Sequence, residues 1–185
     1  MYYVVKYAGP FGFIKPWTAV RDSKTFSQQF LTPSIIEGMR QKLEVSEIVR
    51  HRLTYGGISV QQEQTQTRGI EIKKKEKKAV RAQSILDRGI LLQPTLSLAF
   101  SNIEDANKAI IQHICLCRNE DILLPEGEMQ VMDEDKFNRL PGFELRFGEG
   151  EDSFLVGFNR FDNGSPMYGW LEINGNPIIA RKDYE

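Results

Sequence analysis

The sequence predicts an α+β domain whose elements follow the order βαββαβ. Two observations support this: short runs of β-branched and aromatic residues predict strands, and two amphipathic segments with helix-start signals lie between them. A third observation is a polar and basic tract between the second and third extended runs, which predicts a hairpin. At 185 residues with 41% hydrophobic content, the chain is long enough to bury a core.

The first strand and the first helix have clear boundaries. Residues 2–7 form a β-branched and aromatic run that ends at Gly9-Pro10. Thr32 is a good N-cap and Pro33 suits the first helical position. One face of this helix carries Ile35, Ile36, Met39 and Leu43. We expect that face to pack on the sheet.

The next two strands are expected to form a long hairpin. Residues 47–60 alternate loosely and break at Gly56-Gly57, and residues 85–100 form a second extended segment. Between them the polar and basic tract at 61–84 predicts the tip. Asn102 then caps a second helix, and residues 122–124 form the next strand.

This order of elements is that of ferredoxin-like domains, which RNA-recognition domains share. We therefore expect residues 1–125 to form a ferredoxin-like domain with a basic thumb around 61–84. After Pro125 the pattern changes to extended runs at 143–147, 154–161 and 167–173, split by glycine-rich turns. Residues 126–185 are predicted to be a small antiparallel β extension.

Charge divides the chain into two halves. Residues 1–100 carry a net charge of +8 and residues 101–185 a net charge of -9, although the whole chain is nearly neutral. Clustered cations favour a polyanion such as nucleic acid, because phosphate binding releases counterions. The alternative is a lysine run that is only a solvated loop.

Cations and aromatic residues define the candidate RNA contacts. The loop at 9–21 mixes aromatic rings with cations, as base stacking and phosphate pairing require; rings that fold back over the sheet are the alternative. The candidate RNA-binding residues are Lys15, Trp17, Arg21, Arg50, Arg52, Arg68, Lys73, Lys74, Lys75, Lys77, Lys78 and Arg81.

Signals for catalysis are weak. His51 is a candidate general base for attack by a ribose 2'-hydroxyl, and Tyr55 is a candidate helper. A histidine on a strand without catalytic work is the alternative. His113, Cys115 and Cys117 are too few for a zinc site, so we expect no metal and no cofactor. No Ser-His-Asp signature or phosphate-binding glycine loop is present.

Two observations predict a cytoplasmic protein. No run of 18 apolar residues is present, and the N-terminus lacks the order of a signal peptide. The closely spaced Cys115 and Cys117 suit a reducing compartment. We expect no membrane partner.

Two segments carry a resemblance to a known family. Gly9-Pro10-Phe11-Gly12-Phe13, Pro16 and the segment 30–38 (Phe-Leu-Thr-Pro-Ser-Ile-Ile-Glu-Gly) resemble the start of the Cas-five family of CRISPR-associated proteins. The resemblance implies a ferredoxin-like subunit that caps one end of a Cascade-type surveillance complex. It implies that the subunit grips the 5' handle of the guide RNA, with the hairpin as a thumb and the backbone and large subunits as partners.

Three hypotheses of function follow. The first is a non-catalytic RNA-binding subunit of such a ribonucleoprotein complex. The second is a metal-independent endoribonuclease that processes precursor CRISPR RNA on the same fold. The third is a protein-only adaptor or inhibitor whose acidic half mimics nucleic acid. RNA binding separates the first two from the third, and cleavage in EDTA identifies the second.

Overall fold

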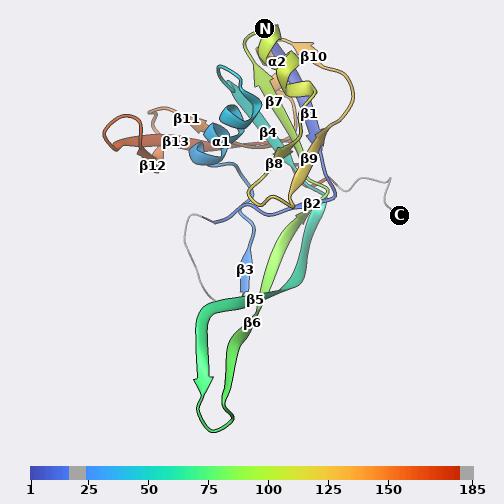
Figure 1. Ribbon diagram of the computed structural model, residues 1–185. Coiled ribbons are helices and arrows are strands. Elements are labelled where there is room, and N and C mark those ends of the chain that lie inside the picture. The colour runs from blue at the N-terminus through green and yellow to red at the C-terminus, as the bar shows by residue number, and fades with distance from the viewer. Residues whose placement is uncertain (17–23, 180–185) are drawn as a thin grey trace.

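The computed structural model shows an α+β protein with mostly antiparallel sheets, as predicted (Figure 1). It describes residues 1–16 and 24–179; of residues 65–68, 71 and 82–84 it describes the backbone alone. The helices are α1 (Pro33–Leu43), α2 (Ile103–Ile110) and α3 (Glu134–Asn138). The strands are β1 (Tyr2–Ala8), β2 (Phe11–Gly12), β3 (Lys24–Phe26), β4 (Arg50–Thr54), β5 (Gly57–Lys73), β6 (Lys78–Leu92), β7 (Thr95–Phe100), β8 (Ile114–Cys115), β9 (Ile122–Pro125), β10 (Gln130–Met132), β11 (Gly142–Phe147), β12 (Phe154–Asn159) and β13 (Ser165–Asn174).

The centre of the molecule is an antiparallel sheet with the strand order β4-β7-β1-β9. Strand β1 pairs with β7 through six residues, from Tyr3 opposite Phe100 to Ala8 opposite Thr95. Strand β7 also pairs with β4, and the end of β1 pairs with β9. Helix α1 connects β1 to β4 through the chain, and α2 connects β7 to β9.

Both main helices begin where the sequence predicts. Helix α1 starts at Pro33 after an extended Thr32, and it ends at Glu44, whose φ of 56° is left-handed. Helix α2 starts after Asn102, whose side chain accepts a hydrogen bond from the Asp105 amide. The Asn102 side chain therefore caps α2, whereas the Thr32 side chain makes no such bond to the backbone of α1.

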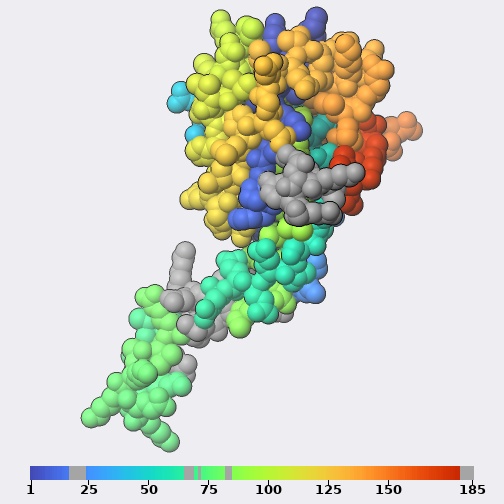
Figure 2. Space-filling view, turned by 90° about the vertical axis from the view of Figure 1, so that its right-hand side faces the viewer, coloured from blue at the N-terminus to red at the C-terminus, as the bar shows by residue number. Residues whose placement is uncertain are grey.

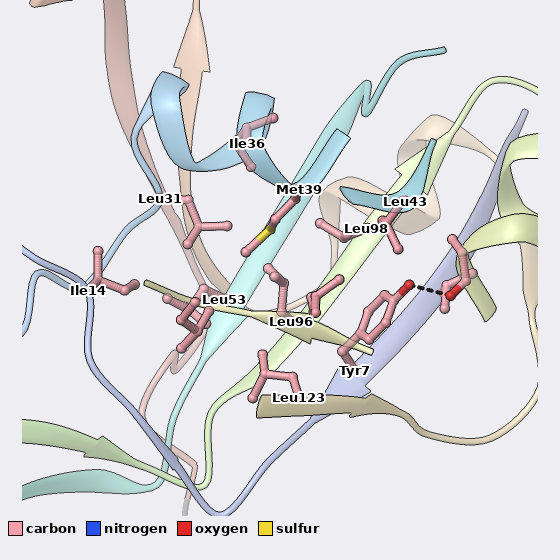
Figure 3. Close-up of a cluster of buried hydrophobic side chains, with 14 of the residues drawn as sticks. Tyr7, Ile14, Leu31, Ile36, Met39, Leu43, Leu53, Leu96, Leu98 and Leu123 are labelled. Carbon is pink, nitrogen blue, oxygen red and sulfur yellow. Dashed lines mark hydrogen bonds between the residues drawn. The ribbon is translucent and has the colours of Figure 1, made fainter. Parts of the chain in front are cut away.

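The main core lies between the two helices and one face of the sheet (Figure 3). Helix α1 contributes Ile36, Met39 and Leu43, which lie over Leu96 and Leu98 of β7. The Tyr7 hydroxyl donates a 2.7 Å hydrogen bond to the Ala109 carbonyl at the end of α2. This bond satisfies the one polar atom that the tyrosine brings into the core.

Gly9 is required by the close approach of β9. A Cβ at this position would lie 2.4 Å from the Ile122 carbonyl oxygen and 2.6 Å from Leu123 Cδ2. Any side chain would therefore push β9 away from the end of β1. The Gly-Pro turn after the first strand thus has a packing reason.

A smaller cluster covers the other face of the sheet. Val4 and Ala99 point away from the helices and pack with Met132 and Phe137. Strand β10, which pairs with β1, and helix α3 supply these two residues. The sheet is therefore covered on both faces near β1.

The predicted basic hairpin is formed by β5 and β6, which extend far from the body (Figures 1 and 2). Its strands pair from Gly57 opposite Leu92 to Lys73 opposite Lys78, with one register shift between Gln66 and Ile70. Near the body, β2 and β3 pair with β6. Most of the tract at 61–84 is thus paired strand, and the turn itself is short.

The predicted C-terminal strands are also present. Strand β11 pairs with β13, and β13 pairs with β12. Strand β11 also pairs with β4 through Phe143 opposite Leu53. The extension therefore continues the central sheet beyond β4. No helix of the described residues is long and apolar enough to cross a membrane.

Replacing Ile36 by aspartate should destabilise the fold by on the order of 3 to 5 kcal/mol, because the substitution buries an unpaired charge. Ile36 is buried in the main core. Urea unfolding of the purified variant measures the change. Ser34→Asp, at an exposed position of the same helix, is the control and should stay near the wild-type stability. An Ile36→Asp protein with wild-type stability would contradict the packing of α1.

Candidate nucleic-acid interface

The tip of the β5–β6 hairpin presents five lysines within six residues. Lys73 and Lys78 are directly opposite each other at the end of the ladder. The turn between them is closed by a 3.1 Å hydrogen bond from the Glu76 amide to the Lys73 carbonyl. Lys77 has a φ of 49°, a left-handed conformation that suits a tight turn. The turn thus brings the ammonium groups of both strands to one end of the hairpin.

These lysines are free to bind a ligand. Lys73, Lys74, Lys75, Lys77 and Lys78 are all exposed. Within the part of the chain that the structure describes, none of the five forms an ion pair. Arg81, opposite Ile70, is exposed as well. Like charges held this close repel one another, and an anionic ligand relieves that repulsion.

Apolar side chains accompany the cations on the outer hairpin. Ile70 and Ile72 are exposed, Ile72 by 70%. Because side chains at positions i and i+2 of a strand point to the same face, these isoleucines share a face. The outer hairpin therefore offers aliphatic surface beside positive charge.

Three of the predicted RNA contacts cannot be placed. Trp17 and Arg21 lie outside the described residues, and only the backbone of Arg68 is described. Lys15 is exposed, in the segment that follows β2. Phe13, from the same aromatic segment, is buried, with the guanidinium groups of Arg88 and Arg118 over its ring. Phe13 therefore folds back onto the protein and is not available to stack on an RNA base.

The structure argues against Arg50 as a phosphate contact. Its side chain is 4% exposed, and it makes two hydrogen bonds to Glu144, with Nε 2.7 Å from Oε1 and Nη2 2.9 Å from Oε2. Nη2 also donates to Asn138 Oδ1 at 2.9 Å. This bidentate pair uses the donors that a phosphate would need. The sequence did not show that Glu144 of β11 and Asn138 and Phe137 of α3 enclose this side chain.

Burial argues against Arg52 as well. It is 1% exposed, and its Nη2 bonds Glu172 while its Nε lies 3.4 Å from Glu144 Oε2. Arg146 also contacts Glu172, with Nη1 3.4 Å from Oε2. Nearby arginines lower the pKa of Glu172, against the opposing effect of its partial burial. We refer to Arg50, Arg52, Arg146, Glu144 and Glu172 as the charge cluster.

His51 and Tyr55 are not placed for catalysis. His51 is buried on the opposite face of β4 from Arg50 and Arg52, and its ring lies 6.4 Å from that of Phe147. Burial lowers its pKa to about 4, with further lowering by the neighbouring arginines. Tyr55 is 1% exposed and stacks on Phe143 at 6.0 Å, and burial raises its pKa. Neither side chain can reach an RNA on the surface.

The structure brings together no metal site among the residues that it describes. His113, Cys115 and Cys117 do line one groove, beside α1. Burial raises the pKa of the Cys115 thiol, which disfavours the thiolate that a metal would require.

Sequence reasoning missed the acidic members of the charge cluster. Glu144 lies between Phe143 and Leu145, so strand alternation alone places it on the face opposite these two apolar residues and does not show what it contacts. The two apolar neighbours face the helix side, and Glu144 faces the arginines of β4. The sequence held only a weak signal for the charge cluster. Arginines stand at alternate positions of one strand, 50 and 52, and glutamates occur in later strands.

Comparison with known proteins gives a likeness to solved structures. No protein-family model matches the sequence, and no curated protein sequence matches it. Among solved structures, the fold is similar to that of a chain titled "CRISPR RNA-guided surveillance complex", with a TM-score of 0.53 and 12% sequence identity. The match covers 100% of this chain and 95% of that chain. The likeness at this identity concerns the fold, and it spans the hairpin and the C-terminal strands as well as the central sheet.

Replacing Glu144 by glutamine should destabilise the protein by about 3 to 5 kcal/mol, because the buried Arg50 loses its bidentate partner and the buried Arg52 loses one of its two counter-charges. Urea unfolding measures the loss. Glu120→Gln is the matched control, because Glu120 pairs with Arg118 while 60% exposed, and it should cost less than about 1 kcal/mol. Equal effects of the two substitutions would show that the charge cluster is not buried as described.

The burial of His51 should make the free energy of unfolding depend on pH between about 7.5 and 5, where most carboxylates stay ionised. The folded state holds His51 neutral, whereas the unfolded chain takes up the proton near pH 6.5. The stability contributed by the neutral ring is therefore complete above about pH 6.5 and is lost as the pH falls toward 4. Between pH 7.5 and 5 the loss should be about 2 kcal/mol.

Urea unfolding across this pH range measures the loss. His51→Gln should flatten the dependence, and His113→Gln, at an exposed position, should leave it in place. A wild-type protein equally stable at pH 5 and 7.5 would refute the burial of a neutral His51.

Proposed function

We propose that this protein is a non-catalytic RNA-binding subunit of a CRISPR Cascade-type surveillance complex and that it grips the 5' handle of the guide RNA. The observation that carries the proposal is the fold likeness over the whole chain to a chain of a CRISPR RNA-guided surveillance complex. The resemblance of residues 9–38 to the Cas-five family belongs to the same proposal. The two observations are independent, because one uses the fold and the other a short sequence motif.

The proposal includes a ferredoxin-like domain. Its strands are β1, β4, β7 and β9, and its helices are α1 and α2. Three features support this: the βαββαβ order, the sheet order β4-β7-β1-β9, and antiparallel pairing at each of the three contacts. Within the second predicted part, residues 126–185, strands β11, β12 and β13 form the proposed extension, whereas β10 and α3 pack on the central sheet.

The hairpin is the proposed thumb on the RNA. Its five tip lysines are exposed and form no ion pair among the described residues, whereas the arginines of β4 are neutralised inside the body. A phosphate backbone is a ligand that this distribution favours, because each neutralised phosphate releases a counterion. Lys15 and Arg81 are further proposed contacts, together with Trp17, Arg21 and Arg68.

The proposed partners are the guide RNA and the backbone and large subunits of the complex, in the cytoplasm. The structure does not support the endoribonuclease hypothesis, because its candidate catalytic residues, His51 and Tyr55, are both buried. Incubating labelled repeat RNA with the pure protein in EDTA tests that reading, and we expect no cleavage.

Replacing all five tip lysines, Lys73, Lys74, Lys75, Lys77 and Lys78, by alanine should weaken RNA binding. The affinity for labelled repeat RNA, measured at several salt concentrations, should fall for every RNA sequence tested. The slope of log affinity against log salt should flatten by roughly 0.7 to 0.9 for each lost phosphate contact.

A body variant of equal charge change is the control. It replaces the exposed cations Lys42, Lys108, Lys136, Arg139 and Arg160 by alanine. It should bind RNA with a slope close to wild type. If both variants lose the same affinity, the effect is one of net charge, and the hairpin has no special role.

A further inference from the structure

The free end of the C-terminal sheet exposes a group of apolar side chains that the RNA-binding role does not use. Phe158 is 63% exposed and Phe161 is 80% exposed. Leu155, on β12 with Phe158, and Tyr168, on β13, are exposed as well. In Figure 1, β11, β12 and β13 project from the side of the body. Exposed aromatic residues grouped in this way usually mark an interaction site.

The register places several of these residues on one face. Leu155 lies opposite Tyr168, and Phe158 lies opposite Pro166, so each pair shares a face. Alternation along β13 adds Trp170, which carries the Arg146 guanidinium 5.6 Å from its ring. We call this surface the β12 patch. It consists of Leu155, Phe158, Pro166, Tyr168 and Trp170.

The patch lies at an open sheet edge. Strand β12 is the last in the sheet order, and within the described residues it pairs with β13 alone. Its outer backbone N–H and C=O groups therefore face away from the sheet. An exposed apolar edge strand is a hazard for aggregation unless a partner covers it.

The turns on either side of β12 are acidic, and this charge favours a basic partner. Glu149, Glu151 and Asp152 in the turn before β12 and Asp162 after it are exposed, and Arg160 is the one cation of residues 148–164. This segment thus has a net charge of -3. RNA would be repelled. A partner with basic side chains is favoured over a second copy, because a second copy would bring the same net charge of -3 to this edge.

We infer that the β12 patch is the docking surface for a partner protein whose contact surface has an apolar centre and a basic rim, and which adds its edge to β12. This inference rests on the proposed function for the expectation that such a partner belongs to the same complex. The patch and the lysine tip lie on different projections of the molecule (Figure 1). One subunit can therefore hold RNA and a protein neighbour at the same time.

The test co-expresses this chain, with an affinity tag, separately with each protein encoded by the genes beside its own. Co-purification and a titration of each purified pair measure binding. Leu155→Ser combined with Phe158→Ser should weaken binding of one neighbour at least tenfold. Ile103→Ser combined with Ile111→Ser is the matched control, because both isoleucines are exposed on or beside α2, and it should bind as wild type does.

A charge-reversal variant provides a second arm that leaves the apolar residues in place. Glu149, Glu151 and Asp152 changed to lysine should weaken the same pair and reverse the sign of its salt dependence. The same change at Glu104, Glu120 and Glu128, which are exposed elsewhere, is its control and should have little effect.

Three results would overturn the inference: no neighbouring protein binds the wild type, both patch variants bind as wild type does, or the wild type forms a dimer that the serine variant abolishes. RNA affinity, measured in parallel, keeps the two proposals distinct. Loss of the protein pair with unchanged RNA affinity supports the patch. A wild type that binds its protein neighbour but no repeat RNA would retain the patch and reject the proposed function.

Discussion

The pairing of Arg50 and Arg52 with Glu144 and Glu172 determines how the rest of the molecule is arranged. Each arginine comes from β4 in the basic half of the chain, and each glutamate comes from the acidic half. Because three of these four side chains are almost fully buried, breaking one partner leaves a charge in a region of low dielectric. The cluster therefore fixes the extension to the edge of the central sheet, and it removes the β4 arginines from the protein's available positive charge.

The available charge is consequently concentrated on the hairpin. Strands β5 and β6 form an antiparallel ladder that extends well beyond the β2 and β3 contacts at its base. No described side chain of the outer half belongs to either buried cluster, so its geometry depends on backbone pairing and on what it binds. A hairpin of this kind can follow the contour of a ligand while the body stays rigid, which suits a thumb that closes on RNA.

Sequence reasoning predicted the features that local chemistry determines. Thr32-Pro33 and Asn102 located both helix starts, and the polar tract between two extended runs located the hairpin. It was wrong about Arg50 and Arg52, because alternation tells which residues share a face but not what covers that face. Their partners lie about ninety or more positions later in the chain, beyond the reach of any local pattern. The burial of His51 and Tyr55 was missed for the same reason, because their rings lie against Phe147 and Phe143 of β11, far along the chain.

The central claim is that the hairpin, and not the sheet around β4, contacts RNA. Ultraviolet cross-linking of the purified protein to repeat RNA, followed by mass spectrometry of the cross-linked peptides, tests it most directly. The account predicts cross-links within residues 69–81 and none within β4. Cross-links concentrated on β4 or β11, with the hairpin unmodified, would contradict it.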